Sequence, residues 1–289
     1  MDFQEGFHRM TNKLTGTAAA AWLALASWWV PASAQDTSPL QCSLPRSPVF
    51  AETSLNPPGE KASEKERPIS YGMEIALSSG HADRGFVISD RPVVQPEVWV
   101  SGRGIKLSLW SNFTLAETRD GSRPQILEME LTREHQCRKL TIAPAIRMFS
   151  YRDGPGIYRT RSMEGWLYLS YDAGPFRLFT NQSLDVLTYR GAYSGEAGIE
   201  SKRRVSPRVE VGGSFGAGWA SSRFNFAYAD INKSALNRIS AESWLTVHVK
   251  PHYYIGPHLE FSTIVDHRVR AELARPTFVF VGLTTGVEF

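Results

Sequence analysis

Acidic side chains recur at every second position in several stretches of this 289-residue sequence, and each time apolar residues alternate with them. Glu128 and Glu130, for example, alternate with Leu127, Met129 and Leu131. A period of two residues places alternate side chains on opposite faces of a β-strand. If such strands enclose a lumen, carboxylates on the inner face would favour cations over anions.

The same alternation assigns many charged and polar side chains to this inward face. The residues that we expect to line the lumen are Glu74, Lys106, Glu128, Glu130, Arg147, Arg177, Glu210, Glu242, His248 and Glu260, and the same face holds Glu164, Asp185, Glu196, Glu200, Lys250 and Glu288. Acids outnumber bases here, although the whole chain has a formal net charge of +3. A packed interior without a path is the alternative, because bulky Trp110, Trp166, Phe179 and Trp244 share the face.

One motif has the form of a hydrolase site. Gly212 to Gly216 match G-x-S-x-G around Ser214, and Asp266 and His267 follow later. That motif requires a strand, a sharp turn and a helix to present the hydroxyl. The next residues have no helical period, and glycines in a barrel strand commonly mark bends or bulges. We therefore predict no enzyme activity and no catalytic residue. The spacing of His and Cys suggests no metal site, and nothing indicates a cofactor.

The alternating segments that carry these residues extend from about residue 67 to the end of the chain. Ile105 to Thr114 show the clearest alternation. Twelve such segments are found if Phe224 to Tyr228 belong to an external loop, and thirteen if they form a strand. Single-chain bacterial barrels have an even number of strands. We therefore predict an all-β fold for residues 67–289, a transmembrane antiparallel up-and-down β-barrel of about 12 strands.

The first 34 residues have the parts of a secretory signal peptide. A basic segment precedes an apolar core of about 14 residues and an Ala-Ser-Ala site ending at Ala34. The apolar core is too short for a transmembrane helix, which is the alternative. Residues 35–66 are rich in Pro, Ser and charged residues, so we predict an irregular periplasmic arm.

Export places the two cysteines of the chain, Cys42 and Cys137, in an oxidising compartment. If odd-numbered strands run outward, the turn at Glu134 to Gln136 and the arm with Cys42 both lie on the periplasmic side. We therefore predict a disulfide between Cys42 and Cys137 that ties the arm to the barrel.

The last strand, Thr277 to Phe289, resembles the carboxy-terminal signal of bacterial outer-membrane β-barrel proteins. In that family an aromatic last residue is recognised by the barrel assembly machinery, which implies that role for Phe289. Arg84 to Leu115 also resembles the opening of a group of small outer-membrane proteins of uncharacterised function. The resemblance implies an outer-membrane location, with outer-membrane lipid and the assembly machinery as partners.

A narrow passive channel for small cationic or neutral solutes, with an acidic lumen, is the function that these observations favour. A non-conducting structural or adhesion barrel is the alternative, and a lipid-modifying enzyme is a more distant one. The small net charge gives no reason to expect a nucleic-acid partner.

Overall fold

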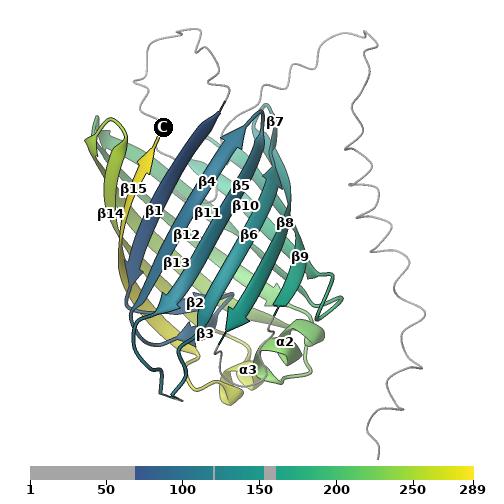
Figure 1. Cartoon of the computed structure of the whole chain (residues 1–289). Coiled ribbons are helices and arrows are strands. Elements are labelled where there is room, and N and C mark those ends of the chain that lie inside the picture. Colours follow the sequence, from purple (N-terminus) through teal and green to yellow (C-terminus); the bar gives the residue numbers. More distant parts are fainter. Residues whose placement is uncertain (1–68, 120, 153–160) are drawn as a thin grey trace, which may run out of the picture. The chain divides into compact units, whose positions relative to one another are not determined.

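The computed structural model describes residues 69–119, 121–152 and 161–289, which form a closed antiparallel β-barrel (Figure 1). The twelve wall strands are β1 (Ser70–Ser78), β4 (Val93–Gly102), β5 (Ile105–Thr114), β6 (Gln125–Arg133), β8 (Leu140–Arg152), β9 (Arg161–Ala173), β10 (Phe176–Asp185), β11 (Tyr193–Ser206), β12 (Val209–Ala220), β13 (Ala235–Lys250), β14 (Tyr253–Ile264) and β15 (Thr277–Glu288). The prediction of twelve strands is confirmed. The predicted signal peptide, the arm and Cys42 lie outside the described residues.

The first and last wall strands pair with each other and close the ring. Their register runs from Gly72 opposite Glu288 to Ser78 opposite Gly282. Beyond it, the Phe289 amide donates to the Tyr71 carbonyl at 2.9 Å, and the Tyr71 amide donates to the Phe289 carbonyl at 3.1 Å. Closure leaves no strand edge, which a sheet in hydrocarbon requires because each unpaired backbone group there costs several kcal/mol.

The outer face of the wall is apolar and exposed. Met73, Leu107, Met129, Phe215 and Val281 are each more than 40 % exposed, although all of them are in well-paired strands. A soluble protein would bury such a band, whereas a barrel in a bilayer places it against lipid. The chain is therefore a transmembrane barrel. Among the described residues no helix is long and apolar enough to cross a membrane.

The two ends of the barrel differ in the length of their connections. At the turn end, strands are joined by short turns such as Arg103 and Gly104, whose φ angles are 52° and 75°. Such a two-residue turn needs positive φ at both positions, which Gly104 adopts without strain. At the loop end, the connections 79–92, 115–124, 186–192, 221–234 and 265–276 are longer.

Two loop-end connections contain helices, α2 (Ser222–Ala229) and α3 (His267–Glu272). The Ser221 side chain caps α2 by accepting from the Phe224 amide. Phe224 to Tyr228 thus lie in a connection, as predicted, and they form a helix that their sequence did not indicate. A buried cluster includes Phe224 and Tyr228 of α2, Phe86 and Val269 of other connections, and Ile264 at the end of β14.

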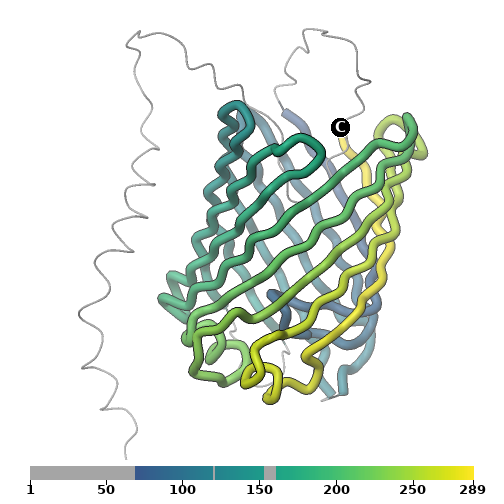
Figure 2. The backbone as a smooth tube through the Cα atoms, turned by 180° about the vertical axis from the view of Figure 1, so that it is seen from behind, coloured from purple at the N-terminus to yellow at the C-terminus, as the bar shows by residue number. Residues whose placement is uncertain are grey.

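Another connection differs from its prediction. Residues 79–92 look like a plain loop in the sequence, but they form a hairpin of β2 (His81–Asp83) and β3 (Phe86–Ser89). Figure 2, which shows the barrel from behind, places this dark-blue hairpin within the ring of wall strands at the loop end. It is a separate two-stranded sheet with no ladder to the wall.

The region around Cys137 also corrects one detail. The turn that we predicted at Glu134 to Gln136 lies slightly later, because β7 (His135–Cys137) pairs with β8 and Arg138 has a φ of 56°. Cys137 is a partly exposed free thiol at the turn end. Its pairing with Cys42 stays a prediction.

The closest backbone contact in the wall gives a stability prediction. A Cβ atom on Gly198 would lie 2.3 Å from the Phe215 carbonyl oxygen of the neighbouring strand, which cannot move without breaking the ladder. We expect Gly198→Val to destabilise the barrel by about 3 kcal/mol, at the upper end for overpacking. The measurement is urea unfolding followed by the mobility shift of unheated protein in gel electrophoresis. Ala197→Val, with its side chain on the lipid face, is the control and should unfold like wild type.

Candidate functional site

The inserted hairpin has a positively charged tip. Arg84 and Gly85 form its two-residue turn, with φ angles of 50° and 91°. Positive φ suits Gly85, but it is unfavourable for arginine by about 1 kcal/mol or more. Such a conformation persists only where the surroundings hold the residue in place, and the contacts of the Arg84 side chain do so.

The Arg84 side chain contacts the wall on the side of the barrel opposite β1 and β4, the strands that the hairpin joins. Its guanidinium donates to Glu164 at 3.2 Å, to the Ser183 hydroxyl at 3.1 Å and to the Ser194 hydroxyl at 3.2 Å. These residues belong to β9, β10 and β11, whereas the hairpin joins β1 to β4. The strand β10 is six strands away from β1 in either direction around the ring of twelve, so Arg84 spans the lumen.

Arg84 also contacts residues of α2 and of the hairpin itself. The Tyr228 hydroxyl lies 2.5 Å from a guanidinium nitrogen, Asp83 lies 3.0 Å away, and the charge lies 4.7 Å from the centre of the Phe224 ring. Burial acts to lower the pKa of Arg84, but the carboxylates of Asp83 and Glu164 together outweigh it, so the pKa is raised. The tip is therefore a permanent cation.

The sides of the hairpin touch the wall as well. Ile88 packs against Ile126, Phe149 and Tyr151 of β6 and β8. On the other side, a Cβ atom on Gly85 would meet Ile264 of β14 at 2.9 Å. Since the hairpin contacts the barrel in several directions, it crosses the lumen at the loop end, and we call it the plug.

His81 begins the hairpin and remains uncharged. Its Nδ1 atom lies 3.2 Å from the amide nitrogen of Gln95, and its ring lies 5.5 Å from that of Trp110. Burial lowers the pKa of His81 to about 4, against the opposing effect of Asp83. Near neutral pH the plug therefore carries its positive charge on Arg84.

Beyond the plug, the inward face of the strands carries a surplus of acids. Its acidic side chains are Glu74, Glu97, Glu128, Glu130, Glu164, Asp172, Asp185, Glu196, Glu200, Glu210, Glu242, Glu260 and Glu288, and its basic side chains include Lys106, Arg147, Arg177, Lys202, Arg204 and Arg238. Many of them alternate with exposed apolar residues of the outer face, as Glu128 does with Leu127 and Met129.

Several of the predicted lumen residues are held in specific contacts. Arg147 lies 2.8 Å from Glu130 and 3.5 Å from Glu128, and it also donates to the Tyr168 hydroxyl at 2.9 Å. Its guanidinium lies 4.2 Å from the centre of the Trp166 ring. This cluster is a packed polar network. Part of the interior therefore resembles the packed interior that the sequence left open as the alternative to a channel.

Other predicted lumen residues form single pairs. The Tyr254 hydroxyl donates to Glu74 at 2.5 Å, and Lys202 lies 2.8 Å from Glu210. Two other predicted bases also form ion pairs. Lys106 lies 3.9 Å from Glu97, and Arg177 lies 3.1 Å from Asp172 and 4.0 Å from Glu200. His248 is buried, and its ring lies 6.3 Å from that of Tyr254 at an interplanar angle of 54°.

Glu242 and Glu260 differ from the residues above. They are direct cross-strand partners on β13 and β14, and within the described part of the chain neither has an ion pair or side-chain hydrogen bond. Like charges directly opposite each other destabilise a sheet. Ser214 of β12 lies opposite Glu242, and Glu200 follows on β11. In this row Glu200 lies 4.0 Å from Arg177, whereas Glu242 and Glu260 form no ion pair in the described ranges.

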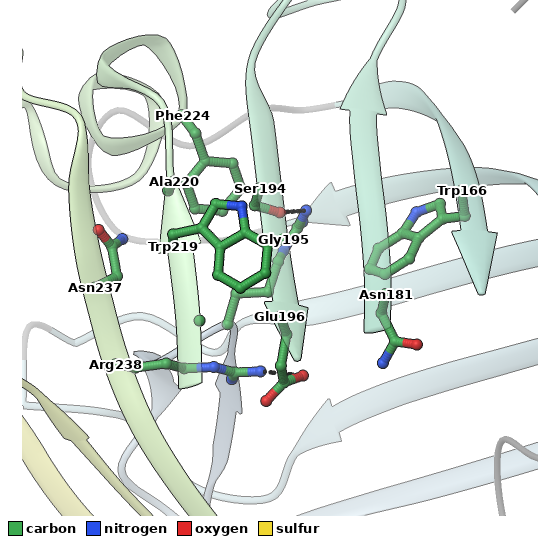
Figure 3. A pocket seen from close by; sticks show the side chains of 12 residues that line it. Trp166, Asn181, Ser194, Gly195, Glu196, Trp219, Ala220, Phe224, Asn237 and Arg238 are labelled. Atoms are coloured by element: carbon green, nitrogen blue, oxygen red, sulfur yellow. Dashed lines mark hydrogen bonds and ion pairs between the residues drawn. The ribbon is translucent and has the colours of Figure 1, made fainter. Parts of the chain in front are cut away.

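A small pocket lies between this acidic region and the plug (Figure 3). Its lining includes Arg84, Trp166, Asn181, Glu196 and Arg238. Figure 3 shows the Glu196 carboxylate beside the Arg238 guanidinium, and the two lie 2.9 Å apart. Glu196, Gly218 and Arg238 occupy one row across three strands. The absent side chain of Gly218 therefore contributes to the space.

Several residues of the site were not predicted. Three charged residues were missed because we had not assigned the two faces of the strand segments around them. These residues are Glu97, Lys202 and Arg238, which alternate with Val98, Arg203 and Ile239. Arg84 was missed because it lies in a connection. The Arg-Gly pair was the available signal for a tight turn, but nothing in the sequence indicated that this turn enters the barrel.

The remaining sequence motifs have clear positions. Ser214 lies within β12, eight residues before α2, so its G-x-S-x-G match does not form the strand, turn and helix of a hydrolase. Phe289 stacks between His252 at 5.1 Å and Tyr71 at 5.6 Å. Recognition of Phe289 by an assembly machinery stays a prediction. No group of three His, Cys, Asp or Glu side chains in the described ranges could hold a metal ion.

No protein-family model and no curated protein sequence matches the chain. Similar solved structures include an outer-membrane channel from Pseudomonas putida F1, with 8 % identity and a TM-score of 0.47 over 80 % of this chain and 100 % of that one. Others are the NanC porin, with 13 % identity and 0.46 over 75 % and 98 %, and the KdgM porin, with 10 % and 0.42 over 76 % and 98 %. The closed ring of twelve strands and the apolar outer face of this chain identify it as a transmembrane β-barrel of the outer-membrane type.

Proposed function

We propose that this protein is a narrow passive channel for small cationic or neutral solutes. The observation that carries the proposal is the acidic surplus of the inward face, concentrated where Glu242 and Glu260 oppose each other and form no ion pair within the described residues. Carboxylates around a passage raise the local concentration of cations and exclude anions. Neutral solutes enter freely if they are small enough.

The hairpin is the reason for calling the channel narrow. Because it spans the loop end from β1 to the wall around β10, a solute must pass beside it or wait until it moves. The wall cannot widen to help, since its strands are joined by continuous hydrogen-bonded ladders. The hairpin has no such ladder to the wall, so it is the element whose displacement would open a path.

A non-conducting structural or adhesion barrel is the second candidate. The same hairpin favours it, because the plug is held by apolar contacts on its sides and polar contacts at its tip. The two candidates differ in one measurable property. A channel conducts ions after reconstitution in a planar bilayer, whereas a structural barrel with a permanent plug does not.

Charge selectivity tests the acidic lumen. We expect Glu242→Gln with Glu260→Gln to lower the cation-to-anion permeability ratio, measured as the reversal potential in a salt gradient. A charge about 7 Å from a passing ion contributes about 0.6 kcal/mol in water, or about threefold in local ion concentration. Glu272→Gln, at the end of the exposed helix α3, is the control. Conduction with an unchanged ratio in the double variant would contradict an acidic selectivity region.

Conductance of Arg84 variants tests the plug. Arg84→Ala alone leaves Glu164 buried without its cation, a change that typically costs about 3–5 kcal/mol. We therefore expect Arg84→Ala with Glu164→Gln to loosen the hairpin and raise single-channel conductance several-fold. Arg223→Ala, which removes an exposed arginine of α2, should conduct like wild type.

Two controls accompany this measurement. Tyr228→Phe removes one hydroxyl from Arg84 and Asp83 and should give a smaller increase. The mobility shift of unheated protein confirms that each variant is folded. If folded Arg84 variants conduct no better than wild type, the hairpin does not limit the passage, and if wild type and all variants are silent, the structural candidate stands.

A further inference from the structure

Three arginines from separate connections meet at one carboxylate on the loop end. Asp90, which follows the hairpin, lies 3.2 Å from Arg275 and 3.3 Å from Arg119, and its neighbour Arg91 lies 3.8 Å away. Arg119 comes from the connection between β5 and β6, and Arg275 from that between β14 and β15. We call these four residues the Asp90 cluster.

The charges of this cluster do not cancel. One carboxylate faces three guanidinium groups, and the neighbouring Glu117 pairs with a fourth arginine, Arg123, at 3.6 Å. The Arg119 side chain is 74 % exposed and that of Arg91 is 46 % exposed, whereas Asp90 is 10 % exposed. The carboxylate therefore holds the arginines together from beneath, and their outer donors remain available to another anion.

The cluster directly borders the lipid-facing surface. Pro92, the residue after Arg91, accepts a hydrogen bond from the amide of Leu115 at 2.9 Å. Leu115 is 55 % exposed, and on the other side Val279, four residues after Arg275, is 57 % exposed. An anion bound at the cluster thus lies beside an apolar band on which hydrocarbon chains can pack.

We propose that the Asp90 cluster binds a phosphate group of a phosphorylated glycolipid in the outer leaflet of the membrane. Guanidinium groups bind phosphate oxygens through paired, charge-assisted hydrogen bonds. The long connections of barrels in this class face the cell exterior, which places the cluster at the level of outer-leaflet headgroups. The adjacent apolar band favours a lipid over a soluble phosphate compound, because it offers contact to acyl chains.

The test compares bound glycolipid in two matched variants of the full-length protein. One variant carries Arg119→Glu and Arg275→Glu, and the other carries Arg223→Glu and Arg268→Glu, which reverse two exposed arginines outside the cluster at the same end. The probes are purified bis-phosphorylated lipid A, its dephosphorylated form and inorganic phosphate. Native mass spectrometry of the protein in detergent measures the lipid bound per barrel, and the mobility shift of unheated protein confirms folding.

We expect the cluster variant to bind about tenfold less bis-phosphorylated lipid A than wild type, and the matched variant to bind about as much as wild type. Arg119→Gln with Arg275→Gln should give an intermediate loss without introducing repulsion. Equal binding by the cluster variant would overturn the proposal, and so would equal binding of the dephosphorylated lipid. Displacement of the lipid by a similar concentration of inorganic phosphate would show a soluble-phosphate site instead.

Discussion

The requirement that no backbone group remain unpaired in hydrocarbon governs this structure. The pairing of β1 with β15 satisfies it, and the hydrogen bonds between Tyr71 and Phe289 extend that seam to the last residue of the chain. Once the ring is closed, the alternation of each strand assigns every second side chain to lipid and the others to an enclosed interior. The apolar outer band and the polar lumen are therefore two consequences of a single constraint.

The interior then has to accommodate charges with little help from bulk water. Arg147 pairs with both Glu130 and Glu128, and Arg84 pairs with Glu164, so these enclosed carboxylates have cations beside them. Glu242 and Glu260 oppose each other across two strands, and neither forms an ion pair in the part of the chain that the structure describes. Such an arrangement costs stability that a single substitution would recover, and the cation selectivity that we propose for the channel would account for it.

Sequence periodicity predicted the wall but not its contents. The alternation in Ile105 to Thr114 is sufficient to assign a strand and both of its faces, and the same reasoning gave the correct strand number. The partners across the lumen depend on register and on the tilt of the strands, which alternation does not report. Arg84 illustrates the limit, since its partners Glu164 and Tyr228 are 80 and 144 residues away in sequence.

The β2–β3 hairpin, which the sequence did not indicate, is the part of the barrel that could move without breaking ladder hydrogen bonds of the wall. Ladder hydrogen bonds fix the diameter of the wall, so any variation in the passage has to come from the hairpin, which is tied to the wall only by side chains. Its tip holds an arginine at a φ of 50°, and the contacts to Glu164, Ser183 and Ser194 must offset that strain. Loss of these contacts would relieve the backbone strain at Arg84, and it would also remove the attraction that holds the hairpin tip to the wall. In the proposed channel, the position of the hairpin would therefore determine whether the lumen is connected to the outside.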